Sequence, residues 1–139
     1  MQPDKAAVVR GWLGRAANDL RGAHIDLDAT PPLIEDALFH CQQAAEKTLK
    51  GYLTSHDKPF KKTHDLDELS RPCLEVDSTL RGVVQPAIPL TVFAWEFRYP
   101  GDTLVPSMTE ARGELKPVSS LSRASFWKFY SIGNGLYFR

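Results

Sequence analysis

Apolar positions along most of the chain recur every three to four residues, which is the spacing of an amphipathic helix. The pattern predicts a first helix from about Asp4 to Asp28 and a second from about Pro32 to His56, with Thr30 as the cap of the second. The apolar stripe of the first helix is formed by Val9, Trp12, Leu13, Ala16, Leu20, Ala23 and Leu27. Off that stripe lie Arg10, Arg15, Asn18 and Arg21. No stretch shows the strict alternation of a strand.

The middle of the chain predicts shorter helices, because prolines interrupt it. Thr63 is expected to cap a third helix that starts near His64, and Pro72 should keep this helix short or kinked. A further helical stretch resumes over residues 90–97 after two prolines, and it stops before the turn signal at residues 99–101.

The last predicted helix runs from about Ser107 to Leu115, and the aromatic segment beyond Pro117 is expected to be irregular. We therefore predict an all-α fold: an antiparallel up-and-down four-helix bundle with an additional short helix and an irregular aromatic C-terminal tail. The bundle is assigned to residues 1–115, and a tail of uncertain structure to residues 116–139.

Composition narrows the class of protein without identifying a chemistry. The 139 residues fit one domain, with 42% hydrophobic and 24% charged residues. Seventeen basic and 17 acidic residues cancel, which argues against nonspecific nucleic-acid binding by the whole chain but leaves a local basic patch open. Two cysteines are too few for a disulfide framework. The chain shows no signal segment and no apolar run of about 18 residues, so we expect a cytoplasmic protein that does not enter a membrane.

The second predicted helix carries more polar groups than packing requires. Four of them share one face at i, i+3, i+4 and i+7 and a fifth lies beside them: Gln43, Glu46, Lys47, Lys50 and Gln42. Lysines on such a face could hold a phosphate, and the glutamine amides could contact a base edge or a backbone group. A solvated face with a Glu46–Lys50 pair and a polar dimer interface are the alternatives.

Two further positions are candidates for chemistry. His64 could act as a general base because the ordinary histidine pKa is near neutrality, although a structural role at a helix start explains it as well. Glu96, Arg98 and Tyr99 precede a turn, where an arginine could grip phosphate with a tyrosine stacked beside it. Alternatively, the arginine complements the helix dipole and the glutamate pairs with a lysine. No metal site is predicted.

Four blocks follow one another along about residues 5–115: Trp12-Leu13-x-x-Ala16-x-x-Asp19-Leu20, Phe39-His40-Cys41-Gln42-Gln43-Ala44-Ala45-Glu46-Lys47-x-x-Lys50, Thr63-His64-Asp65-Leu66 and Glu96-Phe97-Arg98-Tyr99-Pro100-Gly101. In this order and separation they resemble the HEPN domain family (higher eukaryotes and prokaryotes nucleotide-binding), in particular its small stand-alone prokaryotic members. The resemblance implies a helical bundle that pairs as a homodimer. It also implies partnership with a minimal nucleotidyltransferase in a toxin–antitoxin or defence-type system.

Many members of that family are metal-independent ribonucleases, marked by an arginine followed four to six residues later by a histidine. No histidine follows Arg98 here, so the resemblance implies a module that binds a nucleotide, an RNA or a partner, leaning away from an enzyme. The expected binding residues are Gln42, Gln43, Glu46, Lys47, Lys50, His64, Glu96, Arg98 and Tyr99. No cofactor is predicted. A divergent ribonuclease using His64 and Arg98, and a structural dimerisation module without a ligand, remain the alternatives.

Overall fold

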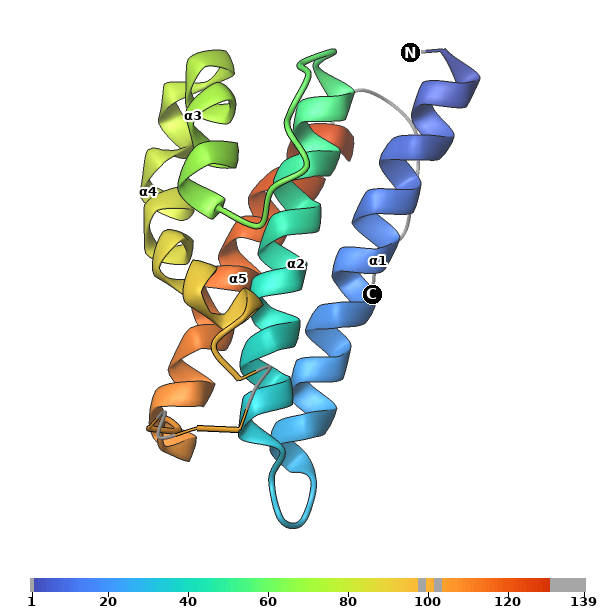
Figure 1. Cartoon of the computed structure of the whole chain (residues 1–139). Coiled ribbons are helices and arrows are strands. Elements are labelled where there is room, and N and C mark those ends of the chain that lie inside the picture. The colour runs from blue at the N-terminus through green and yellow to red at the C-terminus, as the bar shows by residue number, and fades with distance from the viewer. Residues whose placement is uncertain (1, 98–99, 102–103, 131–139) are drawn as a thin grey trace.

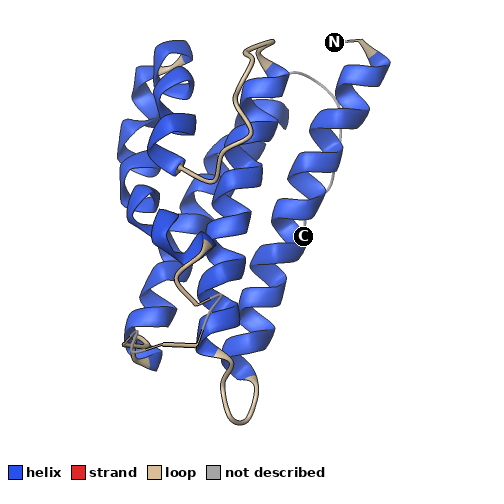
Figure 2. Cartoon of the chain, in the orientation of Figure 1, coloured by secondary structure: helices blue, strands red, loops and turns tan. Residues whose placement is uncertain are grey.

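We describe the fold from a computed structural model. The structure describes residues 2–97, 100–101 and 104–130, and the side chains among them as far as residue 124. Within these ranges every regular element is a helix and no strand occurs (Figure 2). The all-α prediction is therefore confirmed.

Two long antiparallel helices, α1 (Pro3–Asp28) and α2 (Ile34–Ser55), lie side by side along most of their lengths (Figure 1). Their predicted bounds are close to the observed ones, but Thr30 is not the cap of α2. The residue before α2 is Leu33, which has no capping side-chain hydrogen bond. Its backbone N–H instead donates to the carbonyl of Asp26 at 2.8 Å, so the connecting loop folds back onto the end of α1.

A third helix, α3 (Leu66–Val76), begins two residues later than predicted because a different residue caps it. The carboxylate of Asp65 accepts from the backbone N–H of Asp67 at 2.9 Å, as an N-cap does. The Thr63 hydroxyl accepts from the N–H of Asp65 at 3.1 Å and so supports the cap rather than providing it. The helix continues through Pro72 and stays short, as the proline predicted.

Three short elements follow: η1 (Ser78–Leu80), α4 (Arg81–Val84) and η2 (Gln85–Ala94). Both 3₁₀ segments are wound more tightly than an α-helix. The helix predicted over residues 90–97 is wrong in two respects, because this stretch is a 3₁₀ helix and the helix ends at Ala94. The physical reason is that η2 contains two prolines, whose missing N–H groups break an α-helical ladder. A turn at residues 95–97 follows it.

The last helix, α5 (Met108–Tyr130), extends well past its predicted end near Leu115 and crosses the boundary placed there. Beyond Pro117, Val118 and Leu121 remain buried at 0% and 1% exposure and continue the apolar stripe of the helix. Burial of this stripe outweighs the hydrogen bond that the proline removes. The segment up to residue 130 is therefore helical rather than irregular, and residues 131–139 lie outside the described part of the chain.

The core fills the space between the three long helices and the short helices that cover one side of them (Figure 1). Its largest fully buried apolar side chains come from every long helix and from α3, α4 and η2: Leu27, Leu38, Leu49, Leu53, Leu66, Leu69, Leu90, Leu121, Val9, Val84 and Val118. Among the helices that the structure describes, none combines the length and the apolar character needed to cross a membrane.

Candidate functional site

Five of the nine predicted binding residues meet in one place, which we call the Glu46 cluster: Gln42, Gln43, Glu46, Lys50 and His64. Oε1 of Glu46 accepts from Nζ of Lys50 at 2.7 Å. Oε2 lies 2.9 Å from Nδ1 of His64 and accepts from the Gln42 amide at 3.1 Å. Residues of one helix face and the loop before α3 are thus joined by a single carboxylate.

The Glu46 cluster is mostly closed to solvent and saturated with internal hydrogen bonds. Gln42, Glu46 and Lys50 are only 0%, 4% and 8% exposed. The Gln42 amide also donates to the backbone carbonyl of His64 at 3.0 Å, while the Gln43 side-chain amide donates to Oε1 of the Gln42 side chain at 2.7 Å. This network fixes the loop before α3 against α2, and it satisfies the polar groups that burial would otherwise leave unpaired.

The negative charge of Glu46 is balanced by Lys50, and the Lys50 ammonium also lies near two aromatic rings. Burial raises the pKa of Glu46, but hydrogen bonds from Lys50, His64 and Gln42 outweigh this and hold the pKa below its ordinary value. The Lys50 ammonium also lies 5.6 Å from the ring centre of Trp12 and 5.8 Å from that of Phe60, within cation–π range. Glu46 is therefore a carboxylate and Lys50 its buried partner.

His64 is the exposed edge of the cluster, with 58% of its side chain accessible. When the Nδ1–H of an imidazole donates a hydrogen bond to a carboxylate, Nε2 is left as an acceptor, which is the arrangement that orients a general base. Within the described residues Nε2 has no hydrogen-bond partner. This nitrogen is the one position in the cluster where a proton could be exchanged with a bound molecule.

The remaining predicted residues lie elsewhere. Lys47 pairs with Asp19 and ties α2 to α1. Glu96 is half-buried in the turn after η2, and within the described residues it forms no hydrogen bond or ion pair with the Glu46 cluster. Arg98 and Tyr99 lie outside the described part of the chain, so their expected contact with a phosphate stays a prediction.

The sequence reasoning missed a hollow of about 1070 Å³ between α1 and α5, which we call the arginine groove. Its twelve lining residues are Arg10, Gly11, Gly14, Arg15, Ala17, Asn18, Leu20, Arg21, His24, Ser119, Ser122 and Arg123. They include four arginines and no carboxylate. Three of these arginines lie off the apolar stripe of α1, which was the available signal. The groove was missed because α5 was predicted to end before Ser119.

Polar groups around the arginine groove lack bonding partners among the described residues. Nothing in the described structure forms an ion pair with Arg10, Arg15, Arg21 or Arg123. The hydroxyl of Ser122 is buried, in a residue only 6% exposed, and lacks a hydrogen-bond partner there. A buried polar atom without a partner is costly, and an anionic ligand in the groove could accept its hydrogen bond.

The described residues do not form a metal site or an activated cysteine. No three or more histidine, cysteine or acidic side chains gather there in a way that could hold a metal ion. Cys41 and Cys73 are buried and unpaired. Burial raises the pKa of each thiol to about 12, so neither is an activated nucleophile.

Taken together, the fold and these two polar regions define an all-helical domain with one closed polar network and one open basic groove. The family model of the HEPN domain matches residues 9–120, which is most of the chain, and the chain belongs to this family. At the family level, this membership supports a nucleotide- or RNA-binding module. No curated protein and no solved structure matches the chain.

Proposed function

We propose that this protein is a nucleotide- or RNA-binding HEPN module that holds phosphate groups in the arginine groove. The observation that carries the proposal is the presence of four arginines and no carboxylate around one hollow. Guanidinium groups bind phosphate through paired, charge-assisted hydrogen bonds, and Asn18 and Ser122 add neutral donors beside them. Because the formal charge of the chain is zero, this concentration of positive charge is a local feature.

The arginine groove is a better phosphate site than the face of α2 predicted from the sequence. Lys50 and Lys47 already contact Glu46 and Asp19, so a phosphate would have to displace a carboxylate from each. The arginines need no such exchange within the described structure. In this proposal the Glu46 cluster supports the fold, with His64 as its one exposed group.

Titrating the protein with a labelled single-stranded RNA and with ATP, followed by fluorescence anisotropy, tests the groove. Arg10→Ala/Arg15→Ala should weaken binding at least about tenfold, because each lost phosphate contact is charge-assisted. Lys61→Ala/Lys62→Ala removes the same charge from an exposed loop and is the matched control. Equal affinity for the two double variants would refute the groove as the binding site.

A ribonuclease activity is the second candidate, because Glu46 orients the exposed His64 as it would a general base. The base would take the proton of a ribose 2′-hydroxyl as its oxygen bonds to the adjacent phosphorus, and the bond from phosphorus to the 5′-oxygen would break, with water protonating that oxygen. Arg98 would stabilise the charge that develops on phosphate. Incubation of the RNA with purified protein should then give fragments that disappear in both His64→Ala and Arg98→Ala. Binding without cleavage in the wild-type protein supports the non-enzymatic module.

We also propose, from the family resemblance, that the protein forms a homodimer and works beside a minimal nucleotidyltransferase in a toxin–antitoxin or defence-type system. A neighbouring open reading frame that encodes such an enzyme, and its co-purification with this chain, would support the partnership. In the purely structural alternative, neither RNA nor ATP binds and Lys47→Glu dissociates the dimer. Sedimentation of the wild-type and variant proteins measures that outcome.

A further inference from the structure

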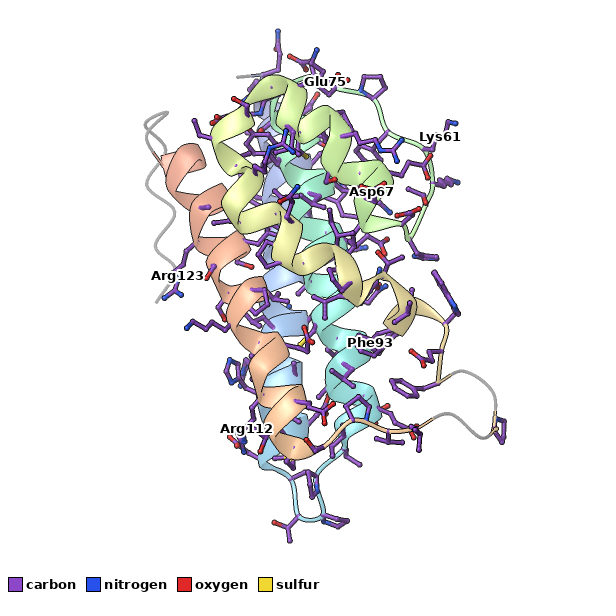
Figure 3. All side chains as sticks on the ribbon, turned by 90° about the vertical axis from the view of Figure 1, so that its left-hand side faces the viewer. Lys61, Asp67, Glu75, Phe93, Arg112 and Arg123 are labelled. Atoms are coloured by element: carbon purple, nitrogen blue, oxygen red, sulfur yellow. The ribbon has the colours of Figure 1, made fainter. Side chains whose placement is uncertain are left out.

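A second hollow, of about 210 Å³, lies between the start of α2 and the end of η2, and we call it the aromatic hollow. Its lining residues are Glu35, Asp36, Phe39, Phe93, Ala94, Trp95 and Phe97. Figure 3 labels Arg123 on the left and Phe93 to the right of it across the molecule, and the two hollows share no lining residue, so this hollow is separate from the arginine groove. Nothing in the proposed function uses it.

The aromatic hollow combines negative charge with accessible ring surface. Glu35 and Asp36 are exposed and form no ion pair with any residue the structure describes. Trp95 is 52% exposed, an unusual degree for a tryptophan. Phe93 and Phe97 stack with ring centres 5.8 Å apart. Among the residues that the structure describes, the hollow therefore offers two carboxylates and several rings and no positive charge.

The Glu46 cluster shows within the same chain what this combination of groups can hold. There, one carboxylate and two aromatic rings surround the ammonium of Lys50, which contacts Glu46 at 2.7 Å and lies 5.6 Å from the centre of the Trp12 ring. The aromatic hollow has the same kinds of groups, with more carboxylates and more rings, but its described lining residues include no cation. The aromatic hollow is therefore chemically complementary to a cation.

We propose that the aromatic hollow is a docking site for a partner protein that inserts an arginine or lysine side chain. The carboxylates would pair with the charged end, and the rings would cover its alkyl stem and charged face. A nucleic acid is disfavoured because Glu35 and Asp36 repel phosphate. A symmetric contact with a second copy of this chain would bring like charges together. The small volume suits one long side chain rather than a helix.

A fluorescently labelled glycine–serine peptide with one central arginine is a direct probe, and the same peptide with glutamine is its neutral control. Anisotropy should show that the arginine peptide binds the wild-type protein more tightly than the glutamine peptide. Trp95→Ala and Glu35→Gln should each weaken its binding about tenfold, since each removes one component of the site. Glu75→Gln, which neutralises an exposed glutamate on α3, should leave binding unchanged.

Four results would overturn the proposal. Equal binding of both peptides, or equal binding by all variants, would show that the hollow does not select a cation. A dimer that Trp95→Ala dissociates would show that a second copy covers the hollow. Arginine-peptide binding that appears only in Arg98→Ala would assign the hollow to the chain's own guanidinium. The RNA titration of Trp95→Ala separates this proposal from the groove, because the groove arginines are intact in that variant.

Discussion

At the scale of single residues, the main feature is a buried ion pair that depends on its neighbours. Glu46 and Lys50 are both nearly inaccessible, so removal of either partner leaves an uncompensated charge or donor. Glu46→Gln should lower the free energy of unfolding by about 3 kcal/mol. The double variant Glu46→Gln/Lys50→Met should recover part of that loss, since the stranded ammonium is gone. Urea denaturation of the four proteins in this cycle measures the coupling.

The same glutamate makes stability depend on pH. Its folded pKa lies below its value of 4.5 outside the protein, so its contribution is complete above that value and is lost as pH falls through the folded pKa. Wild-type protein should therefore lose more stability between pH 7 and pH 3 than Glu46→Gln does. Glu75→Gln should keep the wild-type pH dependence. Denaturant midpoints at a series of pH values would show the difference, and parallel curves for Glu46→Gln and wild type would contradict it.

At the scale of helices, two glycines should respond oppositely to the same substitution. A Cβ at Gly51 would lie 3.0 Å from Leu13 Cδ2 and 3.1 Å from Trp12 Cβ, where α2 packs against α1, whereas one at Gly113 on α5 would meet nothing within 4 Å. Gly51→Ala should destabilise the protein by about 1–3 kcal/mol through overpacking. Gly113→Ala should stabilise it by about 0.5–1 kcal/mol through lower backbone entropy in the unfolded chain. Thermal unfolding followed by circular dichroism measures both.

The helices also show where periodicity predicts structure well and where proline misleads. The stripes of α1 and α2 give nearly correct bounds because amphipathic periodicity over more than twenty residues has one interpretation. A proline in the sequence, by contrast, does not by itself predict whether an α-helix continues. Pro117 lies inside α5, where Val118 and Leu121 gain burial, while the prolines of η2 lie in a 3₁₀ segment. Tertiary packing decides between these outcomes, and it is not visible in a local window.

At the scale of the whole molecule, the formal charge is zero, but the arginine groove is basic and the aromatic hollow is acidic. The arginine groove between α1 and α5 should make RNA binding strongly dependent on salt. For a single strand, each neutralised phosphate contributes about 0.7 to the slope of log affinity against log salt, so Arg10→Ala/Arg15→Ala should reduce the slope by about 1.4. Anisotropy titrations at several salt concentrations measure the slope. An unchanged slope would mean that these arginines do not contact phosphate.

Residue type and spacing were enough to predict the all-helical class, the two long helices, the family resemblance and the group of polar residues on α2. These features follow from periodicity and residue type, which are local properties of the chain. The closed network in which Glu46 contacts Lys50, His64 and Gln42 could be recognised only in the folded chain, because it joins residues from separate segments. The tertiary structure also decided that arginines of α1 face α5 across a groove, since that requires the long α5 and its packing beside α1.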